Sequence, residues 1–415
     1  MTDIKPYKIS VPQGKIDLVK KKLELASFPD ELENIGWELG TPLSEVQRLT
    51  KYWKESFDWR AAESKINEVP QFTTTIEVDD FGQLTTHFIH VKCQVPGVKA
   101  IPLLFVHGWP GSFLECFKML PFLTGGKEGP YFDVVAPSLA DFGFSDAAKK
   151  RGFNTAKHAE LYHKLMLKLG YDEYVAQGGD WGSIIAKFLA MTYGPVHCKS
   201  CHLNHVWWVA PPKLTKNPFL WLQYNLQPHS ERDKTFLKRR SWFLTQGFGY
   251  NHLQGTKPQT VGYSLQDSPV GLLAWIYEKM HDWTDDYKWT DDEILTWVSI
   301  YAYSKSGPTA SGRIYYNDRH RPQEEMAMVY GPVQSSVPIG YSLFPLDIIV
   351  FPVAWGRTTG NVVFEKVHPS GGHFAAHERP EWLADDLRTM FGKGGGAYGV
   401  VSGKNGYDST GNSKL

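Results

Sequence analysis

Short apolar runs alternate with helical stretches from about residue 100 onward. Glycine-rich turns and segments of helical period follow these runs, which occupy residues 102–106, 133–137, 174–177 and 201–206. The alternation is typical of a parallel α/β sheet, because each pair of parallel strands needs a crossover connection. Further strand-like segments and a closing helix are predicted at residues 338–344, 348–355, 361–365 and 380–391. The predicted fold class is therefore α/β with a mostly parallel sheet.

Three segments depart from this alternation. Residues 1–95 combine a helical lead, anchored by aromatic residues, with an extended arm, and we expect them to wrap the core. Residues 211–335 are rich in tryptophan and tyrosine and helical in period, which predicts an inserted helical lid. Residues 392–415 are rich in Gly, Ser, Asn and Lys, so we expect a flexible tail. The α/β core, at 96–210 and 336–391, is then one catalytic unit split around the lid.

Composition narrows the classes of partner. The 44 Lys and Arg residues balance the 44 Asp and Glu residues, so the chain has no broad basic surface for nucleic acid. The 15 Trp, 20 Tyr and 23 Phe residues suffice for a large core and an apolar cavity. Four cysteines exclude a disulfide framework, and the apolar runs are too short to span a membrane.

The segment 178–183, Gly-Gly-Asp-Trp-Gly-Ser, has the form of a nucleophile elbow between a strand and a helix. Asp180 stands where a serine is usual. A carboxylate that attacks an sp3 carbon forms an ester, which water can cleave, whereas a serine would leave an inert ether. Asp180 therefore suits epoxides or alkyl halides, although a lone Asp before a helix also serves as an N-cap.

An elbow requires an oxyanion hole. The loop 107–112, His-Gly-Trp-Pro-Gly-Ser, follows the apolar strand 102–106 and fits the second half of such a site. The main-chain N–H groups of Trp109 and Trp181 are the predicted donors.

The base and its orienting acid are expected after the nucleophile in the chain. His373 lies on the glycine-led loop 371–376 and is the expected base, while a surface or capping role is favoured for its rival His377. Between Glu325 and His373 the acidic residues are Asp347 and Glu365. Asp347 is preferred because it follows a strand at its loop end, where it can fix the tautomer of His373.

Together these motifs resemble those of the microsomal-type epoxide hydrolases of the α/β-hydrolase superfamily. The likeness runs over about residues 5–391 and includes the N-terminal segments 57–60 and 70–72. It implies cofactor-free, metal-free hydrolysis of a small lipophilic epoxide by water, giving a vicinal diol. The segment 138–145 lacks the Pro-Gly pair usual in that family, so we expect an altered pocket wall there.

The resemblance also implies two lid tyrosines that hydrogen-bond the epoxide oxygen. Tyr250, within the segment 248–258, fits the first position. The family pattern S-x-R-x-Y selects Tyr315 for the second, while the spacing from Tyr301 leaves Tyr316 open.

Two other functions compete with epoxide hydrolysis. A haloalkane dehalogenase shares the Asp nucleophile but needs indole donors for the halide, and a non-catalytic binding protein predicts a broken catalytic set. The C-x-x-C-H pattern at 198–202 is set aside as a metal or haem site, because no second ligand pair accompanies it.

The chain ends in Ser413, Lys414 and Leu415, a peroxisomal address when read by the import receptor. Without that address the protein would be cytoplasmic, because residues 1–15 lack the apolar core of a secretory signal. The sequence leaves open whether the chain forms a homodimer.

Overall fold

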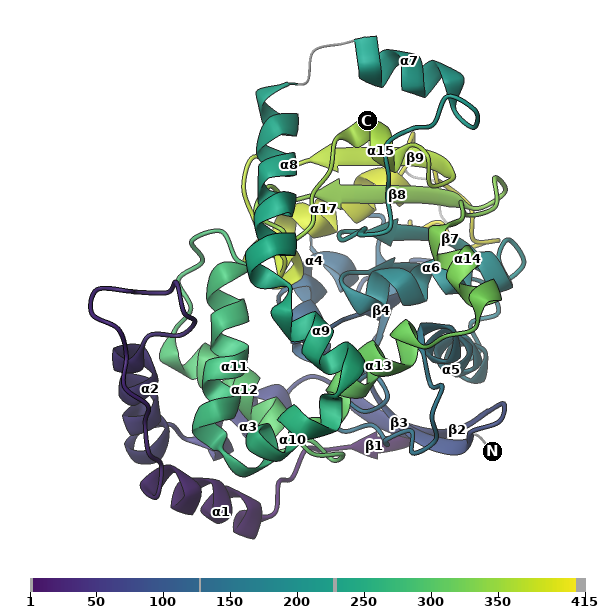
Figure 1. Ribbon diagram of the computed structural model, residues 1–415. Coiled ribbons are helices and arrows are strands. Elements are labelled where there is room, and N and C mark those ends of the chain that lie inside the picture. Colours follow the sequence, from purple (N-terminus) through teal and green to yellow (C-terminus); the bar gives the residue numbers. More distant parts are fainter. Residues whose placement is uncertain (1–2, 127, 227–229, 408–415) are drawn as a thin grey trace.

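The computed structural model describes residues 3–126, 128–226 and 230–407. Its strands form one nine-stranded sheet in the order β1-β2-β3-β5-β4-β6-β7-β8-β9 (Figure 1). The strands are β1 (Lys5–Tyr7), β2 (Gln71–Val78), β3 (Gly82–Val91), β4 (Ile101–Val106), β5 (Phe132–Pro137), β6 (Tyr174–Gly178), β7 (Cys198–Leu203), β8 (Pro338–Leu343) and β9 (Asn361–Val367). The peroxisomal tripeptide 413–415 lies outside the described residues and stays a prediction.

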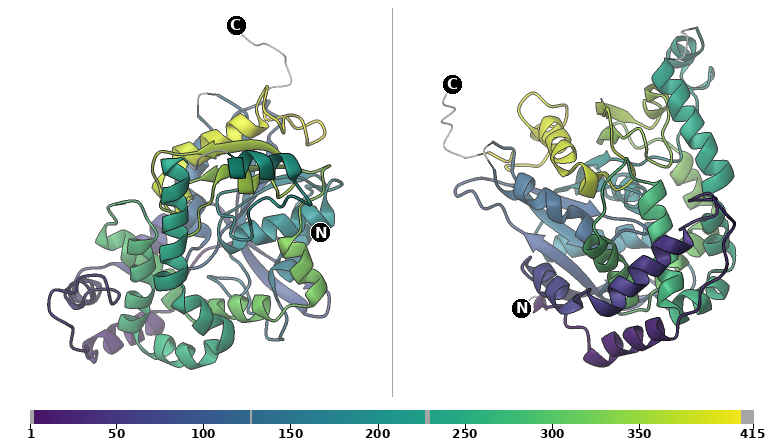
Figure 2. Two further views of the ribbon diagram at one scale, coloured as in Figure 1. Left: turned by 45° about the horizontal axis from the view of Figure 1, so that its top comes forward. Right: turned by 90° about the vertical axis from the view of Figure 1, so that its left-hand side faces the viewer.

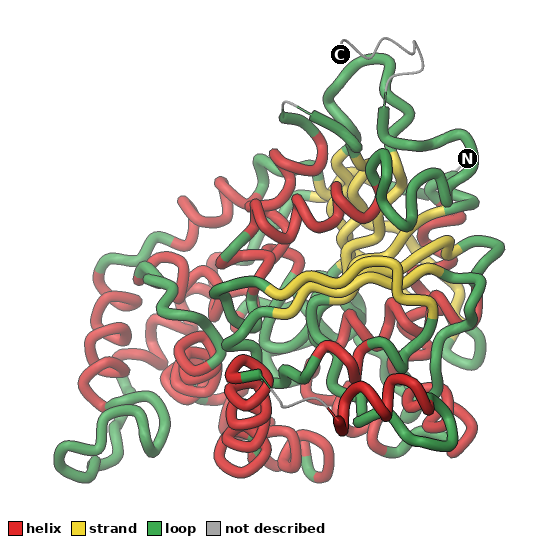
Figure 3. Tube along the Cα trace, turned by 90° about the horizontal axis from the view of Figure 1, so that it is seen from above, coloured by secondary structure: helices red, strands yellow, loops and turns green. Residues whose placement is uncertain are grey.

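The sheet is parallel from β5 to β9 and antiparallel where β1, β2 and β3 add to its edge. Helices lie on both sides of the strands (Figure 3). The core helices are η1 (Phe113–Met119), α4 (Leu120–Thr124), α5 (Thr155–Lys168), α6 (Trp181–Tyr193), α15 (Val353–Gly356), α16 (Ala375–Glu378) and α17 (Pro380–Phe391). Because both faces are covered, every residue of β4 and β6 is buried. The predicted α/β-hydrolase fold is confirmed.

Two strand predictions need correction. The strand expected at 201–206 begins earlier and ends at Leu203, which leaves His205 in the loop beyond it. The segment 348–355 is not a strand: residues 348–352 are irregular and α15 follows. Its residues are apolar because the loop itself is buried, with Val350 1% and Phe351 0% exposed. An apolar run of this length cannot distinguish a strand from a buried loop.

The N-terminal segment contributes more than the expected wrapping of the core. Its helices are α1 (Gln13–Glu24), α2 (Leu43–Glu55) and α3 (Trp59–Ile66). Both α1 and α2 lie against helices of the lid (Figure 2). Arg48 on α2 pairs with Asp291 at 2.6 Å, and Tyr52 donates to Asp292 at 3.0 Å. The segment therefore ties the lid to the sheet edge that β1–β3 extend.

Every regular element described between residues 211 and 335 is helical. These elements are α7 (Pro218–Leu226), α8 (Glu231–Trp242), η2 (Phe243–Gly247), α9 (Gly249–Thr256), α10 (Pro258–Asp267), α11 (Pro269–Asp282), α12 (Asp291–Ala302), η3 (Ala310–Gly312), α13 (Arg313–Arg319) and α14 (Gln323–Tyr330). Helix α14 packs on α6 of the core, where the buried Lys187 donates to the main-chain oxygens of Val329 and Gly331, both at 2.6 Å. These two hydrogen bonds hold the end of the lid against α6, the helix that follows Asp180.

Residues 392–407 are not the flexible tail expected from their composition. Ala397 and Val401 are buried, and Gly406 pairs through its main chain with Lys99 and Tyr131. Main-chain hydrogen bonds, which composition does not reveal, hold this segment against the core. Within the described part of the chain, no helix combines the length and apolarity that crossing a membrane requires.

Candidate active site

Asp180 sits at the sharp turn between β6 and α6. Its backbone has φ +48°, a region that non-glycine residues rarely adopt, and its side chain makes no capping bond to α6. Instead Oδ1 accepts a hydrogen bond from the main-chain N–H of Trp109 at 2.7 Å. The side chain, 14% exposed, lines a pocket of about 370 Å³. The geometry is that of a nucleophile elbow, not of a helix cap.

Two glycines permit the close approach of the elbow to its neighbours. A Cβ on Gly182 would lie 1.9 Å from the main-chain oxygen of Val106, and a Cβ on Gly108 would lie 2.2 Å from Oδ1 of Asp180. Neither position has room for a side chain. Gly108 and Gly182 are therefore required for the close packing of the loop 107–112, β4 and the turn at Asp180.

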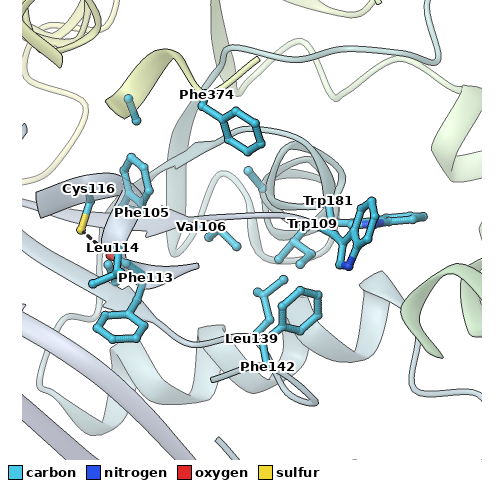
Figure 4. Close-up of a cluster of buried hydrophobic side chains, with 14 of the residues drawn as sticks. Phe105, Val106, Trp109, Phe113, Leu114, Cys116, Leu139, Phe142, Trp181 and Phe374 are labelled. Carbon is cyan, nitrogen blue, oxygen red and sulfur yellow. Dashed lines mark hydrogen bonds between the residues drawn. The ribbon is translucent and has the colours of Figure 1, made fainter. Parts of the chain in front are cut away.

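Trp109 and Trp181 flank the Asp180 carboxylate from two different elements. Both lie at the edge of a buried cluster that includes Val106 and Leu139 (Figure 4). The Trp109 N–H already points at the carboxylate, and Trp181 is the first residue of α6, where a main-chain N–H has no partner within its own helix. These are the two N–H groups that the motifs predicted as oxyanion donors.

The segment 138–145 packs against the loop 107–112. The N–H of Leu139 donates to Nε2 of His107 at 3.2 Å, and Asp141 takes up φ +70° in place of the usual glycine. Asp141 is buried beside Arg313 at 3.4 Å, and burial raises its pKa to about 7. Residues 138–145 do not line the pocket that contains Asp180, so the expected altered wall does not arise there.

His373 and Asp347 complete a chain of polar groups behind the nucleophile. Nδ1 of His373 lies 2.6 Å from Oδ1 of Asp347, and its Nε2 lies 3.5 Å from Oδ2 of Asp180. The side chains of His373 and Asp347 are each 2% exposed. Glu365, the other acidic residue considered, pairs with Arg357 on β9 instead. The structure therefore brings Asp180, His373 and Asp347 together.

The two carboxylates control the charge of His373. Burial alone would lower its pKa, but Asp347 and then Asp180 outweigh burial and raise the pKa to about 10. Burial would raise the pKa of Asp180, yet the bond to His373 leaves it lowered. His205 and His373 likewise outweigh burial and hold the pKa of Asp347 well below its usual range. The free site thus holds an imidazolium between two carboxylates at neutral pH.

His205 is a site residue that sequence reasoning missed. Its Nδ1 lies 2.8 Å from Oδ2 of Asp347, on the carboxylate oxygen that His373 does not use, and its ring meets that of His373 edge-on at 5.0 Å. The pattern in the sequence is weak, because the predicted strand runs through this position. A histidine just beyond the carboxyl end of a core strand is the available indication.

Two lid tyrosines lie over the nucleophile. Tyr250 on α9 stacks on Trp109 at 5.1 Å, and Tyr315 on α13 meets Trp181 at 4.7 Å. Both line the pocket of Asp180, and their rings are 5.8 Å apart. Burial raises the pKa of both phenols well above the ordinary value, so both remain protonated donors. The Tyr315 hydroxyl interacts with the side chains of Tyr250 and Trp181, which shift its pKa in opposite directions.

Tyr316 does not share this pocket. Its ring lies 4.2 Å from that of His320 and under the guanidinium of Arg151, and it lines a different hollow. Of the two tyrosines left open by the sequence, the structure places Tyr315 beside the nucleophile.

His377 was expected at the surface or as a cap, and this expectation is wrong. Its ring is 8% exposed and stacks on Trp289 at 4.9 Å, while Nε2 lies 3.2 Å from Glu293. The short helix α16 turns it toward the lid helix α12, away from Asp180. It therefore joins the lid to the core.

Metal-ligand residue types meet at one point within the described part of the chain. His205, Asp347 and His373 have potential ligand atoms within 4.8 Å of one another. The Nδ1 atoms of both histidines are engaged by the carboxylate, so hydrogen bonding accounts for the cluster. The residues of the C-x-x-C-H pattern do not form such a cluster, and Cys198 and Cys201 lie buried along β7.

Comparison with known proteins places this site in a family. Residues 4–116 match the family model "Epoxide hydrolase N terminus", and residues 101–311 match "alpha/beta hydrolase fold". Epoxide hydrolase 1 of Sus scrofa is 37% identical, over 94% of this chain and 88% of its own. This chain belongs to the microsomal-type epoxide hydrolase family. It is an enzyme that hydrolyses epoxides, which decides among the three functions that the sequence left in competition.

Solved structures of other epoxide hydrolases share the whole architecture. The Aspergillus niger epoxide hydrolase is 33% identical with a TM-score of 0.79, over 92% of this chain and 94% of its own. The juvenile hormone epoxide hydrolase of Bombyx mori is 30% identical with a TM-score of 0.83, over 93% of each chain. The resemblance inferred from the motifs is confirmed, and it covers the N-terminal segment and the lid as well as the core.

Proposed function

We propose that this epoxide hydrolase works through a covalent ester on Asp180. The observation that carries the proposal is the position of Asp180: its carboxylate is held by the Trp109 N–H and faces His373 at 3.5 Å instead of capping α6. In the first step Oδ2 attacks an epoxide carbon, and the bond between that carbon and the ring oxygen breaks. Tyr250 and Tyr315 donate hydrogen bonds to the ring oxygen, and one of the two phenols transfers its proton to it, so that the oxygen becomes a hydroxyl and a phenolate remains.

In the second step water cleaves the ester. Ester formation removes the negative charge of Asp180, so His373 loses one of the two carboxylates that hold its pKa at about 10. The proton that His373 loses passes through water to the phenolate left by ring opening, and Nε2 can then take a proton from water as the hydroxide attacks the ester carbonyl. The bond between the carbonyl carbon and the alkyl oxygen breaks, and that oxygen becomes the second hydroxyl of the diol. The Trp109 and Trp181 N–H groups stabilise the tetrahedral oxyanion, and Asp347 stabilises the imidazolium. Release of the diol restores the Asp180 carboxylate.

The groups above the nucleophile favour an epoxide over a halide as the reacting group. A halide ion leaves without a proton, whereas an epoxide oxygen leaves as an alkoxide that needs a donor. Two protonated phenols, those of Tyr250 and Tyr315, face the pocket. Water and a lipophilic epoxide are therefore the proposed substrates.

An isotope experiment tests the covalent route. A single turnover in water labelled with 18O, with enzyme in excess, is expected to place the label in the Asp180 carboxylate and to leave the diol unlabelled. Mass spectrometry of the peptide that contains Asp180 reads this out. A labelled diol with unlabelled enzyme would show direct attack by water. The D180N variant is expected to lose turnover, and retained activity would contradict the proposal.

We propose in addition that Ser413-Lys414-Leu415 directs the enzyme to peroxisomes. A fusion with a fluorescent protein at the N-terminus is expected to co-localise with a peroxisomal marker. The same fusion without the last three residues is expected to stay in the cytoplasm. Punctate fluorescence that survives the deletion would contradict the proposed address.

A further inference from the structure

The wall of the pocket that contains Asp180 includes a cation with which no carboxylate of the described residues pairs. Arg240, on α8, lines the same pocket as Asp180 and is half-buried there. Its Nη1 is buried and makes no hydrogen bond, and no ion pair to Arg240 is formed by the described residues. We infer that Arg240 binds a carboxylate on the substrate, so that the enzyme prefers epoxides whose apolar chain ends in a carboxylate. This inference rests on the proposed reaction at Asp180.

Other arginines near Arg240 differ from it in their hydrogen-bond partners, their ion pairs or their exposure to solvent. Arg239, the preceding residue, donates to the main-chain oxygens of Leu346, Asp347 and Asp282. Arg321, in the pocket wall, also has a buried Nη1 without a partner, but its Nη2 pairs with Asp318, so a carboxylate balances its charge. Arg319, also in the wall, is exposed to solvent. Arg240 has neither a bound oxygen nor full solvent access, and its contact is with the ring of Trp355 at 5.8 Å.

The surroundings of Arg240 raise the cost of leaving it unpaired. Burial lowers its pKa, yet a guanidinium stays charged at neutral pH. A substrate chain that fills the pocket would remove the remaining water from this cation, which costs free energy unless an anion replaces it. A carboxylate can accept two parallel hydrogen bonds from a guanidinium and balance its charge. A hydrocarbon terminus would leave the guanidinium without a hydrogen-bond partner or a counter-charge.

The rest of the pocket suits an apolar chain. Phe243 and Leu244 follow Arg240 at the end of α8, and Ile348 and Ile349 face the pocket from the loop after β8. Helix α8 is joined through η2 to α9, which carries Tyr250 (Figure 1). A chain anchored at Arg240 would therefore pass along apolar side chains towards the tyrosines and Asp180.

A matched pair of substrates tests the inference. The pair is cis-9,10-epoxyoctadecanoate and cis-9,10-epoxyoctadecanol, which differ only in the terminal carboxylate. The wild-type enzyme is expected to favour the acid in kcat/KM by about tenfold or more, because the bond between a guanidinium and a carboxylate is charge-assisted. Arg240→Met is expected to remove that preference, chiefly by raising KM for the acid, while kcat/KM for the alcohol changes less than about threefold.

Two variants serve as controls. Arg240→Lys keeps the charge without the fork of donors and is expected to keep part of the preference. Arg232→Gln removes an exposed arginine from the same helix, outside the pocket, and is expected to keep all of it. Equal kcat/KM values for acid and alcohol in the wild-type enzyme would overturn the inference. Equal losses on both substrates in Arg240→Met would do the same.

The proposed function fails separately from this inference. If D180N retains turnover of either epoxide, the covalent route is wrong whatever Arg240 does. If D180N abolishes turnover while Arg240→Met keeps the preference for the acid, the covalent route stands and only the role of Arg240 is wrong.

Discussion

Asp347 holds His205 through a 2.8 Å hydrogen bond between the carboxylate Oδ2 and the imidazole Nδ1. Because the other oxygen of Asp347 binds His373, the two histidines fix the carboxylate from both sides. The main-chain N–H of Ile348 also donates to Oδ1 of Asp347 at 2.7 Å, so loss of the bond to His205 would leave Oδ2 free of that partner and loosen the carboxylate only in part. We therefore expect His205 to act as a positioning residue for the proposed step in which His373 is the base.

We expect His205→Leu to slow ester hydrolysis by about tenfold, the effect of one charge-assisted hydrogen bond, and to leave ester formation nearly unchanged. His205→Asn keeps a nitrogen donor near Nδ1 and should recover most of the rate. Rapid-quench measurement of the two steps separates these effects. Equal slowing of both steps, or no recovery in the Asn variant, would indicate a purely structural role.

The charge arrangement around His373 predicts different pH profiles for the two steps. Ester formation needs ionised Asp180, whose lowered pKa keeps it charged in mildly acidic solution. Hydrolysis needs neutral His373, and its pKa of about 10 falls once Asp180 is esterified. Hydrolysis should therefore accelerate as the pH rises through that lowered pKa, while ester formation stays flat. We expect the alkyl-enzyme to accumulate at about pH 6, below the ordinary pKa of histidine, and this can be measured by mass spectrometry. Absence of accumulation at low pH would contradict the charge switch.

Removing either lid phenol should slow ring opening. We expect Tyr250→Phe and Tyr315→Phe each to lower the rate of ester formation by about 10- to 100-fold, since each removes one donor to the leaving oxygen. Tyr316→Phe is the matched control, because this ring lies in a different hollow, and it should retain the full rate. The assay is burst kinetics with a chromogenic epoxide. A larger effect from Tyr316→Phe than from Tyr315→Phe would reverse the assignment.

The Gly108→Ala variant tests whether activity depends on the close approach of residue 108 to the Asp180 carboxylate. A Cβ there would lie 2.2 Å from Oδ1 of Asp180, so Gly108→Ala should displace the nucleophile and lower kcat by about 100-fold, the usual effect of a 1 Å misplacement. Gly14→Ala on α1 meets no atom within 4 Å and should keep wild-type activity. Circular dichroism and Tm distinguish displacement of the carboxylate from unfolding. Full activity in Gly108→Ala would show that the loop can move away.

Part of the candidate site can be predicted from short sequence motifs and from the order of residues along the chain. Asp180 sits in a glycine-bounded turn after an apolar strand, and His373 on a glycine-led loop before the last helix, so chain order and loop position suffice to select them. Asp347 can be chosen because few acidic residues compete with it in that interval. The limits of the lid follow from the point where the alternation of strands and helices stops.

Other features depend on contacts between distant segments. His205 becomes important only because β7 ends at Leu203 and the next loop brings the ring to Asp347, 142 positions away. Val401 is buried although it lies in a segment rich in glycine and polar residues, since main-chain hydrogen bonds hold the segment. Composition does not contain this information.

By itself, the sequence predicted the α/β fold class, the family, and Asp180 and His373 as the candidate nucleophile and base, because each prediction depends on residue types at fixed short spacings. Only the tertiary structure decided between Tyr315 and Tyr316, placed His377 in the interior and exposed the unpaired charge of Arg240. The physical reason is the same in all three cases. Helical period places adjacent residues on different faces, and the packing of the lid on the core decides which face meets the pocket and which charges find partners.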